Sequence, residues 1–452
     1  MAIGIIGMLA AIAVMIIGAY RGIKAIPLTI LAAGVVILTN GMPMWEALSV
    51  HYAGHFGATV GRFFFILVSS SVYAIMMDKT GSTASIGFQL IRWFGTKYVM
   101  VIVFLFTALL TYGGISLFVV FFAALPVAFV LFKEANLPRA MIMAPMGAGG
   151  AGITMTTLPG TPALTNVIPS DFLGTPLTAA PVFSLILAAV IVWLSFVYFG
   201  YLKRSVPKTG DNFTFPAGFD ASAVTSIDRS KLPHPLKAFL PIATLLLFLI
   251  VSSVLGAPWA EDTMLLATLA MTLAALVCIV LNPRRVSLKG VKDWVGDGAN
   301  NAITAIVGLA AVIAFGNVVA NAEAFAALQR WILGLDINVY VKGLVSTGII
   351  SGITGSSSGG AQIALEYLGE YFVAAGTYGD AAYVGANLEV LHRLIAMGAG
   401  TLDTLPHVSA IFLFLALLGC THREAYKYLF WPTVVIPTGV TILGTIAAVI
   451  IW

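Results

Sequence analysis

The sequence predicts an all-α, polytopic membrane protein made of two inverted repeats, each with five spanning helices, a re-entrant hairpin and a broken helix. Three observations support this fold class. Hydrophobic residues make up 60% of the 452 residues and charged residues only 9%, so the chain lacks the polar surface that soluble domains need. Apolar windows of about 20 residues, enough to cross a bilayer, recur along the chain. Short motifs repeat between two halves in the same order.

Ten apolar windows are expected to span the membrane. They lie near 3–20, 25–41, 60–78, 140–168 and 179–201 in the first half, and near 238–256, 263–281, 300–319, 383–420 and 429–452 in the second. The first window has neither a basic flank before it nor a small-residue cleavage site, so we expect a retained helix rather than a signal peptide. Residues 1–201 and 238–452 are therefore the two predicted repeats, and the polar stretch 202–237 is the predicted linker.

The basic residues predict that the two halves are inverted. The first inter-helix loop carries Arg21 and Lys24, whereas its counterpart, GAPWAEDT, has acidic residues and no basic one. The next pair of loops reverses this pattern, because 41–58 has no Lys or Arg and NPRRVSLKGVK has four. Basic loops favour the cytoplasmic side, so we expect a multi-pass protein of the cell inner membrane, with both termini outside and the linker cytoplasmic.

Two polar, glycine-bearing segments predict re-entrant hairpins. One spans about 99–132 with its tip at Tyr112–Ser116, and the other spans about 340–375 with its tip at Thr354–Gly360. Exposed to lipid, their backbone groups would be unpaired at a cost of several kcal/mol each, so they must be shielded or line a cavity. The alternative is that the small residues only allow tight helix packing.

Two expected spans are predicted to be broken near the middle of the membrane. Spans 140–168 and 383–420 each run from a glycine-rich stretch into Thr-Leu-Pro, in MTTLPGT and LDTLPHV. Glycine relaxes a helix and proline removes a backbone donor. Broken helices that face hairpin tips are typical of a substrate site in a secondary transporter, although kinks with a purely mechanical role are the alternative.

The candidate substrate ligands are hydroxyl and backbone N–H donors, which suit a carboxylate and an alcohol on one small molecule. They are Gly113, Gly114 and Ser116 at the first tip, Thr156, Thr157 and Thr161 at the first break, and Thr354, Ser356, Ser357 and Ser358 at the second tip.

Ionisable residues inside spans are functional candidates, because an uncompensated charge there is costly. They are Glu366, Glu389, His392, Arg393, Asp403 and His407. Asp403 and His407 stand four residues apart, so helical geometry would place them on one side and make them a proton-coupling pair. Capping of the next half-helix is the alternative for Asp403. For Arg393, pairing with Glu389 is favoured over substrate contact.

Three long stretches carry a resemblance to a known family. TLPGTPALTNVIPSDFLGT at 157–175, SGITGSSSGGAQIALE at 351–366 and GAGTLDTLPHVSAIFLFLALLGCTHREAYK at 398–427 resemble the gluconate permease (GntP) family of the ion transporter superfamily. The similarity is greatest to its D-beta-hydroxybutyrate permease branch. That branch often has Asp-Thr-Leu-Pro-His-Asn-Gly, whereas here Val408 and Ser409 follow His407. The departure puts in doubt an amide contact at the first of these positions and the exact substrate.

The resemblance implies proton-coupled uptake of a small hydroxy-monocarboxylate, such as 3-hydroxybutyrate or gluconate. It also implies paired hairpins and a homodimer whose transport domains move in an elevator-like way. Sodium coupling and uncoupled transport are alternatives. We expect no enzyme activity, no cofactor, no metal site and no nucleic-acid partner, since no matching motif occurs.

Two other functions fit the sequence less well than a coupled carrier does. GSSSG at 355–359 formally matches G-x-S-x-G, but a hairpin tip does not supply the strand-turn-helix that a serine hydrolase requires. A channel would need a continuous polar lining, whereas the polar residues here cluster at two tips and two breaks. His422 is expected to lie at the solvated surface, and Cys278 and Cys420 to be inert packing residues.

Overall fold

The computed structural model describes residues 2–112, 117–161, 163–209, 212–215, 232–255, 257–260, 263–377 and 385–452. Their regular structure is almost entirely helical, as expected for apolar segments that must pair their own backbone groups in lipid. One short parallel pair of strands joins β1 (Gly376–Thr377) to β2 (Ala386–Asn387).

The first half contains long apolar helices and short helical turns of 3-10 or π type, labelled η. In chain order they are α1 (Ala2–Tyr20), α2 (Ala25–Thr39), α3 (Met44–Glu46), η1 (Ala47–Gly54), α4 (His55–Lys79), α5 (Ser82–Phe94), η2 (Thr96–Tyr98), α6 (Val99–Tyr112), α7 (Leu117–Glu134), η3 (Arg139–Ile142), α8 (Met143–Gly149), η4 (Gly150–Thr154), α9 (Leu164–Leu173) and α10 (Pro181–Thr209).

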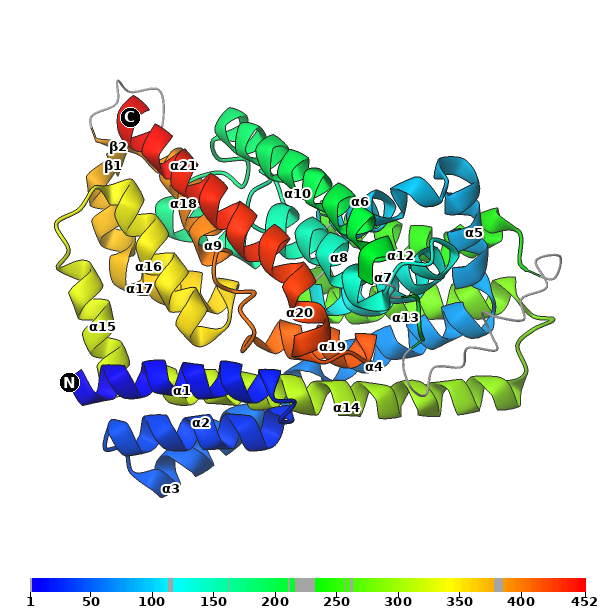
Figure 1. Ribbon diagram of the computed structural model, residues 1–452, viewed down its shortest axis with the longest axis horizontal. Coiled ribbons are helices and arrows are strands. Elements are labelled where there is room, and N and C mark those ends of the chain that lie inside the picture. Colours follow the sequence, from blue (N-terminus) through cyan, green and yellow to red (C-terminus); the bar gives the residue numbers. More distant parts are fainter. Residues whose placement is uncertain are drawn as a thin grey trace.

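The second half is likewise a series of helices of very different lengths. Its helices are α12 (Pro235–Val254), η6 (Pro258–Ala260), α13 (Thr263–Leu281), α14 (Leu288–Ala320), α15 (Glu323–Leu333), α16 (Val339–Thr354), α17 (Ser357–Ala375), α18 (Leu388–Ala399), α19 (Ser409–Leu418), α20 (His422–Phe430), η7 (Trp431–Val435) and α21 (Ile436–Ile451). In Figure 1, α14 runs across the lower part of the molecule, with α2 and α3 below its left part and α16 and α17 above it.

Fewer helices reach full spanning length than the sequence predicts. Within the described residues, five helices are long and apolar enough to cross a membrane, or six if α5 and α6, bent by 104°, count as one. The expected total of ten is not met by this criterion, because several predicted spans are interrupted or short. Helix α2, for example, has 15 residues, and at about 1.5 Å per residue it is shorter than the roughly 30 Å hydrocarbon layer.

Helix α14 joins the two main apolar clusters of the interior. Its first part, with Ile306 and Leu309, belongs to the cluster built around α4, α7 and α8. Its last part, with Phe315 and Val318, belongs to the cluster around α1, α2 and α18. Helix α14 also contacts α4, α2, α16 and α19 directly, and it runs along most of the length of the molecule in Figure 1. This helix therefore connects elements of both halves.

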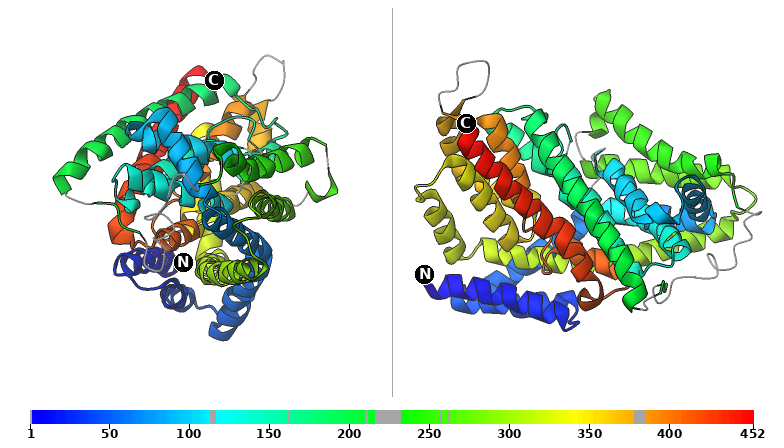
Figure 2. Two further views of the ribbon diagram at one scale, coloured as in Figure 1. Left: turned by 90° about the vertical axis from the view of Figure 1, so that its right-hand side faces the viewer. Right: turned by 45° about the horizontal axis from the view of Figure 1, so that its top comes forward.

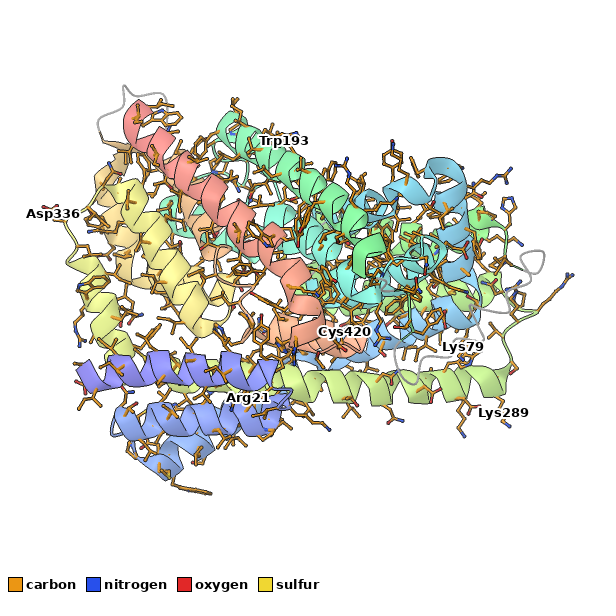
Figure 3. The ribbon with its side chains drawn as sticks, in the orientation of Figure 1. Arg21, Lys79, Trp193, Lys289, Asp336 and Cys420 are labelled. Carbon is orange, nitrogen blue, oxygen red and sulfur yellow. The ribbon has the colours of Figure 1, made fainter. Side chains whose placement is uncertain are left out.

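The outer faces of α10 and α21 are apolar, as lipid contact requires. Trp193 on α10, labelled in Figure 3, is 65% exposed, and Ile450 on α21 is also exposed. The two helices lie side by side in Figure 1 and in Figure 2. An apolar groove of about 460 Å³ lies between them, lined by residues such as Leu194 and Leu443, and none of its lining residues belongs to a predicted break. The polar site must be sought elsewhere.

Candidate functional site

The turn between α16 and α17 brings polar groups together at one tip. Helix α16 ends at Thr354 and α17 begins at Ser357, within the stretch where the sequence predicts a tip. Gly355 makes the reversal in the left-handed region, at φ +67°, which glycine adopts without steric cost. The Ser356 hydroxyl caps α17 by accepting the Gly359 N–H at 3.1 Å. Thr354 donates to Ile350 O at 2.8 Å. Among the described residues of the tip, this leaves Ser357 and Ser358 as the hydroxyls without a hydrogen bond to a backbone group.

The segment that the sequence predicts as the first tip is described only at its flanks. Helix α6 ends at Tyr112 and α7 begins at Leu117. The predicted ligands Gly113, Gly114 and Ser116 lie outside the described residues. Tyr112 donates its hydroxyl to Pro159 O at 3.1 Å, so the end of α6 contacts the Thr-Leu-Pro segment of its own half.

The first broken helix is interrupted at 155–163, between η4 and α9. Thr156, Thr157 and Thr161 are all buried there. Thr156 Oγ1 lies 3.4 Å from both Ala151 O and Thr157 Oγ1. These are long contacts for a hydroxyl, whose hydrogen bonds cluster near 2.7–2.8 Å. The Thr161 hydroxyl instead accepts the Ala163 N–H at 3.3 Å, so Thr156 and Thr157 are the more available donors.

The second broken helix is interrupted at 400–408, between α18 and α19. This segment forms turns, so the expectation that Asp403 and His407 share a helical face is wrong: the proline and glycines prevent a continuous helix. Both side chains nevertheless face the hairpin of α16 and α17. His407 Nε2 donates to Gly352 O at 2.8 Å, and the Asp403 carboxylate lies within interaction range of the Ser357 hydroxyl.

Two polar atoms at this second break are buried without a protein partner. They are Asp403 Oδ1 and His407 Nδ1. Capping does not account for Asp403, because Val408 is the N-cap of α19 and receives no side-chain hydrogen bond. Since buried polar groups are nearly always paired, these two atoms are the natural places for a proton, a water or a substrate group.

The two breaks touch each other. A Cβ atom placed on Gly400 would come within 2.5 Å of Thr156 Cγ2, so the two interruptions approach as closely as glycine allows. Phe121 on α7 and Phe414 on α19 stack with ring centroids 4.2 Å apart. The second tip also reaches the second break, since a Cβ on Gly355 would lie 3.7 Å from Val408. One tip and both breaks therefore form one contiguous region.

The remaining ionisable candidates have defined partners. Arg393 is fully buried and donates to backbone carbonyls, so the predicted pair with Glu389 is wrong. Glu389 instead accepts the Ala180 N–H at 2.7 Å. The segment after α9 separates the two side chains, because it offers a backbone N–H to Glu389 and backbone carbonyls to Arg393. Glu366 is exposed and accepts from Gln362 at 2.8 Å.

Sequence reasoning missed the donors that hold the second break. His422 was expected at the surface but is buried, and its Nε2 donates to Pro406 O at 2.8 Å. Tyr426 donates to Thr404 O at 2.9 Å. The sequence predicts only that a Thr-Leu-Pro break exposes backbone carbonyls that need hydrogen-bond donors. It does not indicate which residues donate. Within the described ranges, no group of three His, Cys, Asp or Glu side chains is placed to hold a metal ion.

Comparisons with known proteins assign the family. The model of the GntP family permease matches residues 2–451. The chain is 30% identical over 465 residues to the uncharacterized transporter YxjC of Bacillus subtilis, covering 94% of this chain and 95% of that protein. It is 26% identical over 373 residues to the high-affinity gluconate transporter of Escherichia coli, covering 79% of this chain and 80% of that one.

A solved structure, that of the Alcanivorax borkumensis YdaH transporter, aligns over 99% of both chains with a TM-score of 0.45 at 13% identity. The family match covers nearly the whole sequence, and the Bacillus relative matches over almost its full length. These two matches show which family of proteins this apolar helical bundle, with its buried polar region, belongs to. The chain is a multi-pass membrane transporter of the GntP permease family.

Proposed function

We propose that this transporter is a symporter that couples an inward proton gradient to uptake of a small hydroxy-monocarboxylate. The observation that carries the proposal is the buried Asp403 Oδ1, which has no partner where the α16/α17 tip meets the second break. A carboxylate in such a place is costly while charged and is relieved by a proton. Alternating between the two forms is what proton coupling needs.

The substrate site is proposed to lie between this tip and the two breaks. Ser357 and Ser358 stand in the first turn of α17, whose N-terminus carries partial positive charge and favours an anionic group. Thr156 and Thr157 supply hydroxyls from the first break, where their present contacts are long. Thr161, Thr354, Ser356 and the first tip with Gly113, Gly114 and Ser116 complete the predicted set. The similarity to a gluconate transporter supports a hydroxy acid as the ligand.

His407 is proposed to link protonation to movement of the hairpin. Its Nε2–H holds the carbonyl of Gly352, in the last turn before the tip, while Nδ1 has no partner. Gain of a proton at Nδ1 would add positive charge beside the tip and the substrate carboxylate. The inverted repeats, the elevator-like motion, the homodimer and the outward placement of both termini belong to the same proposal.

The test is uptake of labelled D-gluconate and D-3-hydroxybutyrate into proteoliposomes under an inward proton gradient, an inward sodium gradient or neither. We expect accumulation above equilibrium with the proton gradient alone. Accumulation that follows only sodium, or mere equilibration under all three conditions, would replace proton symport with the sodium-coupled or uncoupled alternative.

A pair of His407 variants separates proton coupling from support of the hairpin. His407→Gln can still donate an N–H to Gly352 O but does not titrate, whereas His407→Ala loses both functions. We expect neither variant to accumulate substrate, while counterflow of labelled against unlabelled substrate survives better in His407→Gln. Full accumulation by His407→Gln would remove His407 from the coupling mechanism.

A further inference from the structure

One face of α18 is bound to the segment that follows the first break. Glu389, His392 and Arg393 stand at positions i, i+3 and i+4, which share one side of a helix. All three make polar contacts with residues between 156 and 180. Helix α18 leads into the second break, so this face joins the broken helix of one half to that of the other.

Arg393 makes the most numerous of these contacts: four carbonyls surround its guanidinium, each at or beyond the long end of the N–H···O range. Its guanidinium is fully buried. One terminal nitrogen donates to Thr156 O at 3.5 Å and Leu158 O at 3.4 Å. The other donates to Leu177 O at 3.4 Å and Ala179 O at 3.2 Å. The planar guanidinium thus connects the segment before α9 to the segment after it.

The charge of Arg393 has no acidic partner in the described chain. Glu389 is directed to Ala180 N, and Arg393 contacts no other carboxylate among the described residues. Nε of Arg393 also lacks a partner. A buried cation that is balanced only by carbonyl dipoles is tolerated where its geometry is needed, because desolvating it is costly.

His392 strengthens the same junction as a neutral residue. Asn166 Nδ2 donates to Thr161 O at 2.8 Å and Leu177 O at 2.9 Å, which fixes Oδ1 as an acceptor. His392 Nε2, 2.9 Å from Asn166 Oδ1, therefore carries the hydrogen. Its Nδ1 is left to accept from the Thr175 hydroxyl at 2.6 Å. Both ring nitrogens are satisfied, so this histidine is a structural crosslink and not a proton carrier.

We propose that Arg393 is a positioning residue for substrate: it acts through the carbonyls of Thr156 and Leu158 and fixes the first break against Gly400. This inference rests on the proposed transport function for its kinetic consequence. Arg393 does not contact the ligand in this arrangement. By anchoring the backbone on both sides of Thr157, it sets where the two threonine hydroxyls point. The planar fork is required, and positive charge alone does not replace it.

The main test compares Arg393→Lys with Arg330→Lys. Arg330 is exposed on α15 and serves as the matched control. Lysine keeps the charge of Arg393 but offers one point donor, so it cannot hold two pairs of carbonyls. For Arg393→Lys we expect KM for substrate uptake to rise by roughly tenfold, with maximal rate per correctly folded molecule changed by less than about threefold. A purely structural role would lower the amount of folded protein and leave KM unchanged.

A second readout does not depend on any substrate. In a background with Cys278 and Cys420 replaced by serine, Thr157→Cys reports the exposure of the first break to a membrane-permeant maleimide. Thr157 is 1% exposed, so labelling should be slow. Adding Arg393→Lys should speed labelling roughly tenfold, whereas adding Arg330→Lys should not. Equal labelling rates with and without Arg393→Lys would overturn the positioning role, even if wild-type protein carried none of the substrates tested. Faster labelling in a protein that takes up none of these substrates would instead overturn only the proposed function.

Discussion

The two interruptions, at 155–163 and 400–408, carry the same Thr-Leu-Pro triplet but differ in what surrounds them. In the first, the carbonyls of Thr156 and Leu158 are held from the other half by Arg393, and that of Pro159 is held from its own half by Tyr112. Those of the second are held from its own half by Tyr426 and His422. Only the second also contains a carboxylate oxygen and an imidazole nitrogen without partners. We therefore propose that the first break is a fixed wall of the site and that the second break carries the groups that exchange protons.

The largest effect is expected from Asp403→Asn, which removes the proposed proton-coupling carboxylate and keeps the shape of the side chain. A gradient of one pH unit can drive about tenfold accumulation per proton, since tenfold in concentration equals about 1.4 kcal/mol. We expect this accumulation to disappear, while counterflow continues because Asn can still accept from Ser357. The measurement is the plateau of uptake against counterflow in proteoliposomes.

Asp336→Asn is the control for that experiment, because Asp336 is an exposed carboxylate at the edge of the molecule (Figure 3). It should behave as wild type. Gradient-driven accumulation that persists in Asp403→Asn would show that the two breaks do not differ in the way proposed.

A smaller effect is expected from Gly400→Ala, which tests whether the breaks must touch. The new Cβ would lie 2.5 Å from Thr156 Cγ2, and overpacking of this kind costs about 1–3 kcal/mol. Thr156→Ser removes that methyl group and keeps the hydroxyl. The double variant should therefore recover most of the thermal stability in detergent and of the uptake lost in Gly400→Ala. If the double variant is no better than the single one, the contact between the breaks is not what limits this position.

The smallest effects are expected from two matched tyrosine variants. Tyr426→Phe leaves the carbonyl of Thr404 without its donor in the interior, at a cost of about 1 kcal/mol or more. Tyr112→Phe removes the equivalent donor to Pro159 O, but Tyr112 is 43% exposed. Solvent or lipid headgroups can replace it, so the melting temperature in detergent should fall more for Tyr426→Phe. A reversed order would mean that the first break depends on its own half more than Arg393 suggests.

Much of the architecture follows from local sequence. The polytopic helical class follows from composition, and the interruptions at both Thr-Leu-Pro triplets follow from proline and glycine chemistry. The turn near Gly355 follows from the glycine and serine run. Each of these depends on the residues of the segment itself, which is why the sequence alone predicts them.

The partners of polar groups could not be predicted in the same way. Arg393 has a carboxylate four residues earlier, and helical spacing favours that pair, but backbone carbonyls more than 200 residues away take the guanidinium instead. His422 stands in a polar stretch that is typical of a loop, yet tertiary packing buries it against the second break. Such contacts are decided by which elements meet in three dimensions, and periodicity carries no information about that.

The junction between α18 and the first break also has a consequence for how the protein is made. Arg393 lies 214 residues after Ala179, one of the carbonyls that it holds. When the first broken helix enters the membrane during synthesis, its donor has not yet been translated. The carbonyls of Thr156 and Leu158 must therefore be satisfied by water or by the insertion machinery until α18 arrives. A ribosome that stops before residue 393 leaves the first half without its own completed break, so completion of this half depends on synthesis of the second.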